Sequence, residues 1–540
     1  MKNFSLFSLL IAVILYIFAF KFINFTMGNK KRVRFLVNNE ILYKEEVDEE
    51  PEFIIKNGIP KQVSKISNKE DKELEKKMQR FKDMLQDANL DFKQYQYDGV
   101  KWCIENEMCP DPVENVRGGF IADEMGLGKT ITALGIITAY RLPNTLIVVP
   151  PVLLDQWEAQ IYRITGKPAL VYYGAERKTI GLEDFMKNTV VLTTYTMLIK
   201  KLSPLLSMKW SRVIFDEAHH LRNKNSRFYA CKKLNTHIKW LMTGTPIQNR
   251  VEDYYNLCNA LGFSEEFYRD ETNRIIVGTF YVLRRTKAQV GIEMPQLSVQ
   301  TKIVPWKSKE EQEMSEEIHS TLRFSNVSLN KKGGELAQRL KKDGAFASLL
   351  RARQSCIMPS LLKQKIGKNS KYSNIVNKSS SKLDYVIDFI LDRKDNGKGK
   401  LVFCHFREEI NQVVARLNAG GIQNVGIMDG RVSADMRQKV LTTKYDVLVL
   451  QIQTCCEGIN LQDNYSEIYF ISPHWNPSVE DQAIGRCHRI GQKNDVEVFR
   501  FVMSGQDFET DTEDDEAITL ENYINNRQNE KRQIGKILLD

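Results

Sequence analysis

Apolar residues in this chain form short continuous runs that alternate with stretches of helical spacing. Continuous Val, Ile and Leu runs of this length are typical of strands buried on both faces of a parallel sheet. Polar or turn residues follow each run, so we expect the chemistry at the carboxyl edges of the strands. The runs are Leu146–Val149, Val190–Leu192, Val213–Phe215, Leu401–Phe403, Val447–Leu450 and Ile468–Ile471. The pattern predicts an α/β fold whose architecture is repeated in the two halves of the chain.

The segment before the first half mixes acidic and basic side chains. Asn68–Gln86 carries Lys and Glu at helical spacing, which predicts a solvated extension with one exposed helix. Between the two halves, Ser308–Arg323 and Gly334–Cys356 have helical periodicity. Residues 363–382 follow with six lysines and no acidic residue. This composition is typical of a flexible linker, and a DNA contact is the alternative.

The first 26 residues form a separate problem. Phe4–Phe20 is almost wholly apolar, and Lys30, Lys31 and Arg32 follow it. Three interpretations stay open: a leader translated before a start at Met27, a membrane segment with the body on the cytosolic side, or a signal peptide.

These observations divide the chain into six expected segments. They are an apolar leader or membrane segment (1–26), a charged extension (27–90), a first lobe (91–290), a helical protrusion with a Lys/Ser-rich linker (291–380), a second lobe (381–505), and an acidic loop with a C-terminal helix (506–540).

Composition adds two points. The net charge of +9 is compatible with a polyanionic partner, although it does not by itself establish one. The nine cysteines include no CxxC pair, which argues against a zinc or redox centre and favours reduced thiols.

The stretch GGFIADEMGLGKT, residues 118–130, carries the first chemical signal. Gly126 and Gly128 let backbone N–H groups approach a phosphate chain closely. Lys129 would bring a positive charge to the β- and γ-phosphates, and Thr130 a hydroxyl to Mg²⁺. The strict phosphate-loop form needs glycine where Asp123 stands, so a chance Gly-rich turn is the alternative for this stretch alone.

Two carboxylates provide the second signal. Asp216 and Glu217 follow a predicted buried strand, and buried carboxylates are costly unless they meet a cation. Asp216 can hold Mg²⁺, and Glu217 can polarise the attacking water for displacement at the γ-phosphate. An acidic surface loop is the alternative.

Two further stretches support a nucleotide pocket. Gln96 precedes an amphipathic stretch and offers both donor and acceptor groups, as the edge of adenine requires. A capping role for this glutamine is the alternative. The small residues Thr243, Gly244 and Thr245 suit a segment that senses the γ-phosphate and shifts. An ordinary strand-to-turn exit is the alternative for this stretch alone.

The second half contributes a pair of arginines. Arg486 and Arg489 lie three residues apart, on one face if the stretch is helical. Guanidinium groups from a separate lobe can neutralise charge on a transferring phosphoryl group, which is worth roughly 10³ to 10⁵ in rate. Hydrolysis would then require closure of the two lobes.

As a set, these motifs resemble the Swi/Snf-like ATPases of helicase superfamily two. The resemblance covers roughly residues 90–540. The matching stretches are DEMGLGKT (123–130), DEAHH (216–220), LMTGTPIQN (241–249), LRRTK (283–287), LLRARQSC (349–356) and QAIGRCHRIGQ (482–492). The resemblance implies two RecA-like parallel-sheet lobes, with helical insertions between them, that close on ATP–Mg²⁺ and step along double-stranded DNA.

The resemblance also implies site residues. Gln96 matches the adenine-reading glutamine, Asp216 and Glu217 the Mg²⁺-binding and water-activating pair, and Arg486 and Arg489 the finger arginines. The phosphate loop corresponds to Asp123, Glu124, Met125, Gly126, Leu127, Gly128, Lys129 and Thr130. Contacts with the DNA backbone carry no information on base sequence. The resemblance implies such contacts for Pro150–Pro151, Thr193–Tyr195, His405–Phe406 and Gly458–Leu461.

One stretch departs from the family. Gln453–Cys456 stands where the family often has Lys or Arg followed by Ala-Gly-Gly, so the close backbone approach that glycines permit is in question. The Gln-Thr version looks like the compact relatives found in large DNA viruses. No bromodomain-, chromodomain-, zinc-finger- or RING-like segment is visible in the sequence.

The sequence thus predicts a DNA-dependent ATPase that translocates on double-stranded DNA and remodels protein–DNA complexes, nucleosomes among them. The alternatives are a strand-separating DNA helicase and a non-catalytic DNA-binding scaffold. We expect ATP and Mg²⁺ as ligands. We expect a nuclear or cytoplasmic location, in the host cell if the protein is viral, while membrane anchoring depends on residues 1–26.

Overall fold

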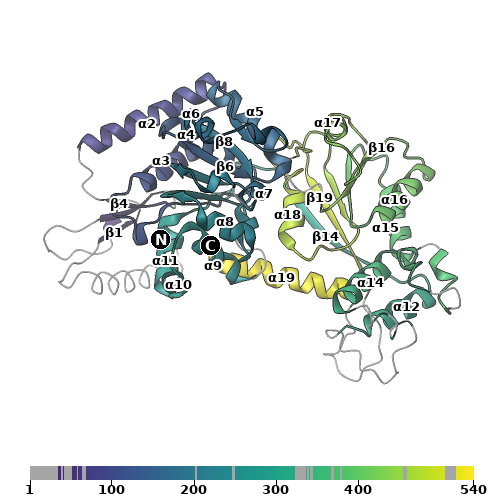
Figure 1. Ribbon diagram of the computed structural model, residues 1–540. Helices are drawn as coiled ribbons and strands as arrows, with labels where there is room; N and C mark the ends of the chain where they lie inside the picture. Colours follow the sequence, from purple (N-terminus) through teal and green to yellow (C-terminus); the bar gives the residue numbers. More distant parts are fainter. Residues whose placement is uncertain are drawn as a thin grey trace. The chain divides into compact units, whose positions relative to one another are not determined.

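The chain forms two compact units, one of residues 1–247 with 251–290 and the other of residues 248–250 with 291–540 (Figure 1). The computed structural model describes residues 34–37, 40–41, 52–56, 59–63, 68–200, 203–245, 250–322, 336, 338, 340, 344–366, 370–377, 380–453, 459–504 and 519–539. The expected leader at 1–26 and most of the expected acidic loop lie outside these residues. Each unit has its own parallel sheet, which confirms the predicted α/β fold with two parallel-sheet lobes.

The first unit is built on a seven-stranded sheet in the order β13-β5-β12-β10-β6-β8-β7, and all neighbours are parallel. Its central strands are buried along their whole length, as the continuous apolar runs predict. The strands are β5 (Arg117–Ile121), β6 (Thr145–Val149), β7 (Leu170–Tyr172), β8 (Val190–Thr194), β10 (Arg212–Phe215), β12 (Ile238–Met242) and β13 (Val282–Leu283).

Helices cover both faces of this sheet (Figure 1). They are α2 (Asn68–Asp87), α3 (Gln94–Met108), α4 (Lys129–Ala139), α5 (Leu154–Thr165), α6 (Leu182–Lys187), α7 (Tyr195–Leu198), α8 (Ser226–Lys233), α9 (Val251–Leu261), α10 (Glu265–Arg269) and α11 (Glu271–Tyr281). Two small sheets accompany them: β1 (Arg34–Val37), β2 (Glu40–Ile41), β3 (Glu52–Lys56) and β4 (Ile59–Val63) in one, and β9 (Lys209–Trp210) with β11 (Asn235–Thr236) in the other.

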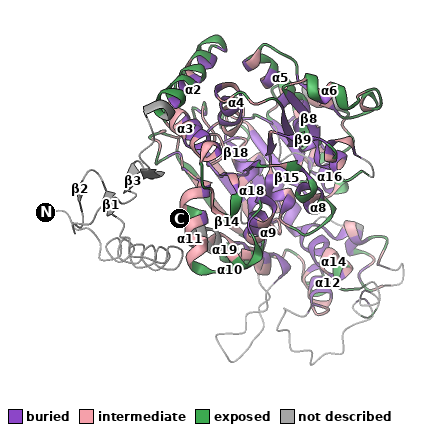
Figure 2. Ribbon diagram, turned by 60° about the vertical axis from the view of Figure 1, so that its left-hand side comes forward, coloured by how far each residue is buried: buried purple, intermediate pink, exposed green. Residues whose placement is uncertain are grey.

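Helix α2 differs from the exposed helix that we predicted. One face of α2 is buried and the opposite face is exposed (Figure 2). Leu74, Met78, Phe81 and Leu85 enter the same apolar core as α3 and α4. The physical reason is that these apolar residues recur at helical spacing between the charged ones, so they form a stripe that the first unit buries.

The second unit is built on a six-stranded parallel sheet in the order β14-β19-β18-β15-β17-β16. Its strands are β14 (Leu297–Val304), β15 (Lys400–Cys404), β16 (Val425–Met428), β17 (Val447–Gln451), β18 (Glu467–Phe470) and β19 (Val496–Met503). Its helices are α12 (Lys309–His319), α14 (Ala345–Ile357), α15 (Ser381–Leu391), α16 (Arg407–Ala419), α17 (Ala434–Thr442), α18 (Pro477–Ile484) and α19 (Leu520–Leu539). Strand β14 lies in the segment where we expected only the protrusion and linker.

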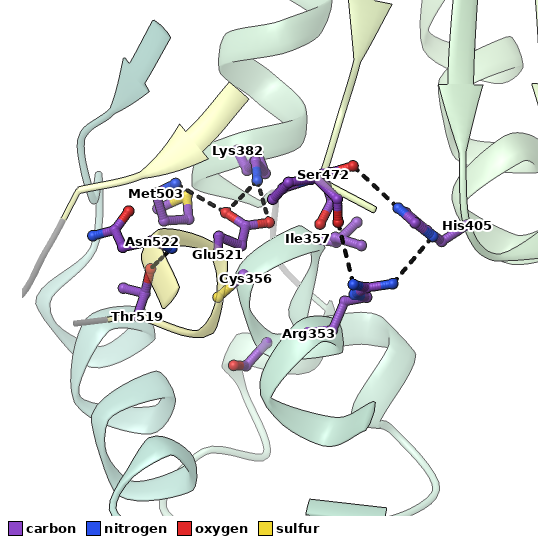
Figure 3. A network of polar contacts seen from close by, with 12 residues as sticks. Arg353, Cys356, Ile357, Lys382, His405, Ser472, Met503, Thr519, Glu521 and Asn522 are labelled. Atoms are coloured by element: carbon purple, nitrogen blue, oxygen red, sulfur yellow. Dashed lines mark hydrogen bonds and ion pairs between the residues drawn. The ribbon is translucent and has the colours of Figure 1, made fainter. Parts of the chain in front are cut away.

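The predicted flexible linker is also wrong for the part of residues 363–382 that the structure describes. Ile366, Tyr372 and Ile375 are buried in a core shared with α12, α14 and α19. Lys382 is fully buried, and its Nζ lies 2.5 Å from the carboxylate of Glu521 on α19 (Figure 3). A lysine-rich composition suggested solvent, but the partners of these side chains come from distant parts of the sequence.

Among the described residues, no helix has both the length and the apolar character that a membrane crossing needs. The apolar leader at 1–26 lies outside these residues.

Candidate active site

Four neighbouring strands of the first sheet, β13, β5, β12 and β10, end at one edge. The phosphate-loop stretch follows β5, Asp216 follows β10, Thr243 follows β12, and Arg285 follows β13 shortly afterwards. Because all these strands are parallel, their carboxyl ends bring the predicted site residues of the first unit together.

The loop after β5 has the conformation that its glycines predict. Gly126 has φ +95° and Gly128 has φ +83°, both in the region that favours glycine. Helix α4 begins at Lys129, so its N-terminal N–H groups and the positive end of its dipole lie at the loop. This is a cradle suited to an anionic phosphate chain.

Gln96 lies against this loop. Its side-chain Nε2 donates to the carbonyl of Leu127 (3.2 Å), and a Cβ placed on Gly128 would come within 2.6 Å of the same nitrogen. A cavity of about 130 Å³ adjoins the glutamine and is lined by Leu90, Asp91, Lys93, Gln96 and Ile131. Gln96 therefore lies between the phosphate-loop stretch and this cavity.

Lys129 also remains at the loop. Its Nζ donates to the carbonyl of Asp123 (2.8 Å), and a Cβ placed on Gly244 would lie 3.4 Å from that Nζ. The Thr243–Gly244–Thr245 segment after β12 thus lies next to the loop. Pro246–Asn249 of the same motif lies outside the described residues.

The match to the phosphate loop suggests that Asp123 contacts the nucleotide, but its carboxylate is paired with Arg285 instead. The side chain of Asp123 has no exposed surface, and both carboxylate oxygens accept hydrogen bonds from Arg285 (2.5 and 3.0 Å). The carboxylate is therefore paired inside the protein rather than offered to a nucleotide. Its backbone carbonyl contributes to the site by accepting from Lys129.

Asp216 is a buried carboxylate with a defined orientation. Its Oδ2 accepts from the indole N–H of Trp157 (2.8 Å), and its Oδ1 accepts from the backbone N–H of Glu217 (2.9 Å). Burial and the nearby Glu217 raise the pKa of Asp216 to about 6, while Lys129 acts in the opposite direction. The hydroxyl of Tyr195 donates to the Asp216 carbonyl (2.7 Å) and fixes the backbone.

Glu217 has a left-handed backbone with φ +47° and ψ +50°. A residue with a side chain in this region costs about 1–3 kcal/mol, and such strain gathers at functional sites. Its Oε2 lies 3.2 Å from Nδ1 of His219. The two adjacent carboxylates thus have different partners, Trp157 for Asp216 and His219 for Glu217, which suits two different roles.

The residues present fit Mg²⁺ bound together with a nucleotide. Mg²⁺ prefers oxygen ligands, and it is commonly held by one or two carboxylates plus phosphates and water. Asp216 and Thr130 supply that donor set, and the raised pKa of Asp216 marks a carboxylate that a cation would stabilise. Among the described residues there is no cluster of three His, Cys, Asp or Glu side chains that would hold a metal by itself.

The arginines of the second unit differ from the helical arrangement considered above. Helix α18 ends at Ile484, and Arg486 and Arg489 lie in the turns that follow. Burial and the positive charge of the neighbouring Arg486 lower the pKa of Arg489. The two guanidinium groups are therefore close enough to repel each other, although they do not lie on a helix. Arg489 Nη1 donates to Asn460.

Gln492 organises these turns. Its Nε2 donates to the carbonyls of Tyr465 (3.0 Å) and Cys487 (3.2 Å), and its Oε1 accepts from two backbone N–H groups. The hydrogen bonds of Gln492, at the end of the QAIGRCHRIGQ stretch, therefore stabilise the turns that contain both arginines.

Most side chains implied in DNA contacts are buried. Thr193, Thr194, Tyr195 and His405 have little or no exposed surface, and Tyr195 is committed to Asp216. Pro151 and Asn460 are exposed, and Gly458 lies outside the described residues. The buried residues could contact DNA only through their own main-chain N–H and C=O groups, because their side chains are packed inside the protein.

Sequence reasoning missed two residues of this site. Trp157 was not singled out, because nothing in its sequence surroundings points to Asp216. Arg285 stands in the quoted LRRTK stretch, but its partner Asp123 is 162 residues away, and the sequence does not say which residues meet.

Comparisons with known proteins match two family models to this chain. Residues 95–361 match the model of the SNF2-related domain, and residues 381–491 match that of the helicase conserved C-terminal domain. Together the two matches cover more than two thirds of the chain.

Three relatives illustrate the range of similar proteins. An "Uncharacterized ATP-dependent helicase" of Mycoplasma pneumoniae is 27% identical over 440 residues, which is 76% of this chain and 40% of the relative. A "Probable global transactivator" of Orgyia pseudotsugata multicapsid polyhedrosis virus is 28% identical over 472 residues, 81% of this chain and 89% of the relative. The Danio rerio "Chromodomain-helicase-DNA-binding protein 1-like" is 26% identical over 446 residues, 76% of this chain and 42% of the relative.

The chain therefore spans less than half of the bacterial and fish relatives and most of the viral one.

Proposed function

The chain belongs to the Swi/Snf-like, SNF2-related family of helicase superfamily two, and from this premise we propose that it is a DNA-dependent ATPase. It couples ATP hydrolysis to translocation on double-stranded DNA and to the remodelling of protein–DNA complexes. We further propose that it acts in the nucleus or cytoplasm, where such complexes occur.

One observation carries the ATPase proposal. The carboxyl ends of β5, β12 and β10 bring Lys129, Gly244 and the Asp216–Glu217 pair to one edge of a buried sheet. A cation, a segment of small residues and two carboxylates with different partners are groups suited to phosphoryl transfer to water. Loop glycines with positive φ complete the phosphate cradle.

Each residue then has a role that follows from its position. Gln96 reads the base, the backbone of Gly126 and Gly128 binds the phosphates, and Lys129 neutralises their charge. Thr130 and Asp216 would hold Mg²⁺, which would supply further neutralisation of the transferring phosphoryl group. Glu217 accepts the proton of the attacking water.

The arginines of the second unit complete the proposal. Arg486 and Arg489 would stabilise the charge of the transferring group when the two units close. DNA would promote that closure and so raise the rate of hydrolysis. The net charge of +9 and the DNA-binding names among the relatives support duplex DNA as the partner.

Phosphate release by the purified chain tests the proposal. We expect duplex DNA to raise the rate, and we expect nucleosomes to raise it as well. Glu217→Gln should keep ATP and DNA binding but lose roughly 10²-fold or more in turnover, because only the proton acceptor is removed. Lys129→Ala should weaken ATP binding itself. A rate that duplex DNA leaves unchanged would contradict the proposal and favour a non-catalytic scaffold.

The name of the mycoplasma relative favours a second candidate, a strand-separating helicase. A triplex-displacement assay beside a strand-displacement assay distinguishes the two activities. Displacement of a third strand without unwinding supports translocation on the duplex. Efficient unwinding would replace our proposal with the helicase.

A further inference from the structure

Arg285 is a buried arginine whose donors are divided between two segments of the first unit. Its Nε and Nη2 donate to the two carboxylate oxygens of Asp123 (3.0 and 2.5 Å). Its Nη1 donates to the backbone carbonyl of Tyr95, and the guanidinium carbon lies 5.5 Å from the centre of the Tyr95 ring. The planar fork of arginine makes this double engagement possible, whereas a lysine ammonium could not reproduce it.

Both segments adjoin the nucleotide site. Tyr95 immediately precedes Gln96, and Asp123 begins the phosphate loop and accepts from Lys129 through its carbonyl. Gln96 in turn donates to Leu127 in the middle of that loop. The start of α3 and the loop are therefore joined twice, once directly through Gln96 and once through Arg285.

Space for the guanidinium is built into α3. A Cβ placed on Gly99 would come within 2.7 Å of Arg285 Nη2. Glycine inside a helix costs roughly 0.5–1 kcal/mol relative to alanine, so its presence here needs a reason. The contact with Arg285 supplies that reason.

The segment that carries Arg285 is also attached to the loop through Glu124. The Glu124 N–H donates to the Arg285 carbonyl (2.9 Å), and Lys287 Nζ lies 3.1 Å from Glu124 Oε1. The Lys287 N–H donates to the other oxygen of the same carboxylate (2.8 Å). These contacts fix the backbone of residues 285–287 beside the first two residues of the loop.

We propose that Arg285 is a positioning residue that holds the base-reading glutamine and the phosphate loop in one rigid frame. The inference rests on the proposed ATPase function, because it concerns how the same site recognises a nucleoside triphosphate. It gives Asp123, which departs from the strict loop pattern, a role: its carboxylate is the anchor for the arginine. Without the frame, Gln96 would no longer keep its place relative to the phosphates, and both affinity and the preference for adenine would fall.

Equilibrium binding of ATP and GTP to the full chain, followed with fluorescent analogues in the presence of Mg²⁺, tests the inference. We expect Arg285→Met to weaken ATP binding at least tenfold and GTP binding by less. The ratio of the affinity for ATP to the affinity for GTP therefore falls. Arg285→Lys should be intermediate, because it keeps a charge for Asp123 but not the contact with Tyr95. In steady-state hydrolysis, KM for ATP should rise more than kcat falls.

A purely structural role would give a different result. It would lower the active fraction and therefore kcat, with KM and the ATP/GTP ratio unchanged. Arg269→Met is the matched control, because Arg269 forms an exposed ion pair with Glu265 on α10. If Arg285→Met does not fold, the double variant Asp123→Ala with Arg285→Met removes the unpaired buried carboxylate and is measured instead.

Wild-type nucleotide affinity and base preference in a folded Arg285 variant would overturn the inference, as would an equal loss for both nucleotides. Failure of the ATPase proposal is distinguishable, because binding is measured without hydrolysis. A wild-type chain that binds ATP but never hydrolyses it would contradict the proposed function alone.

Discussion

Asp216 shows how one side chain depends on its surroundings. It is buried, and the indole N–H of Trp157 holds one of its oxygens at 2.8 Å. Removal of a hydrogen bond to a charged group costs about 1.5–3 kcal/mol, which corresponds to roughly 10- to 100-fold in binding. If Asp216 holds Mg²⁺ as proposed, the orientation of its carboxylate depends on Trp157, a buried residue of α5.

We predict that Trp157→Phe raises the Mg²⁺ concentration needed for half-maximal nucleotide binding about tenfold or more, while metal-free nucleotide binding changes little. The ring packing is kept and only the donor is lost. A Mg²⁺ titration at fixed nucleotide measures the effect. Trp210→Phe is the matched control, because that buried indole donates to the Leu205 carbonyl instead. Equal Mg²⁺ requirements in the two variants would contradict the role of Trp157.

Glu409 in the second unit provides a pH test. Its Oε2 accepts from the backbone N–H groups of His405 (2.8 Å) and Phe406 (2.9 Å) at the start of α16. Burial raises its pKa to about 7, despite these hydrogen bonds. The folded state therefore favours the protonated carboxyl, and this contribution to stability is full below pH 4.5 and is lost as the pH rises through 7.

We predict that Glu409→Gln gains in stability relative to the wild type as the pH rises from 5 to 8, by up to about 3 kcal/mol. The amide can accept the same backbone donors and has no charge to bury. Urea unfolding of both proteins at several pH values measures the difference. A difference that does not change with pH would contradict the raised pKa.

At the scale of single residues, the sequence indicated which residue types could act in a nucleotide site, but it did not indicate which side chains contact them. Lys129, Asp216 and Glu217 could be proposed as site residues because phosphoryl transfer needs such groups at the ends of buried strands. Their supports could not be identified, because Trp157, Tyr195 and Arg285 come from other elements, and only the folded chain shows which side chains meet.

Among the elements, α2 is connected to the site through its packing on α4. Phe81 is fully buried, and a Cβ on Gly135 of α4 would lie 2.7 Å from its ring. The two helices therefore approach closely because α4 has a glycine at that point. Since α4 begins at Lys129, packing of α2 supports the helix that presents the phosphate loop.

We predict that Phe81→Ala destabilises the first unit by about 3–5 kcal/mol, the usual cost of deleting a buried aromatic ring. Removal of residues 1–90 should be worse, because it exposes the apolar face that α2 covers. Thermal unfolding and solubility of the variants measure these effects. Tyr229→Ala, at an exposed ring on α8, is the control and should change stability little. Normal stability after removal of residues 1–90 would show that α2 is dispensable.

The elements also mark the limit of pattern reading. The six predicted apolar runs all form buried strands, which are β6, β8, β10, β15, β17 and β18. The buried strands β5, β12 and β19 were not predicted, because glycine or charged residues interrupt their apolar runs. The segment 363–382 was predicted wrongly, because its lysines suggested solvent while Lys382 and Tyr372 are held by Glu521 and Glu317 from other helices. Spacing likewise could not decide that Arg486 and Arg489 lie in turns beyond α18.

At the scale of the whole molecule, the proposed chemistry is divided between two units. Lys129, Asp216 and Glu217 belong to the first unit, and Arg486 and Arg489 belong to the second. If the arginines stabilise only the transition state, they contribute to turnover and not to the initial binding of ATP. This division would let the chain bind nucleotide in one state and hydrolyse it only after closure.

We therefore predict that replacing both Arg486 and Arg489 by alanine lowers DNA-stimulated turnover by roughly 10³-fold or more, with ATP affinity within a few-fold of the wild type. Phosphate release and equilibrium binding of an ATP analogue, measured on the same preparations, separate the two effects. Arg431→Ala is a suitable control, since Arg431 is a half-exposed arginine of the second unit that pairs with Asp429. If the double variant keeps its turnover, or if residues 68–290 alone hydrolyse ATP as fast as the full chain, hydrolysis does not need the second unit.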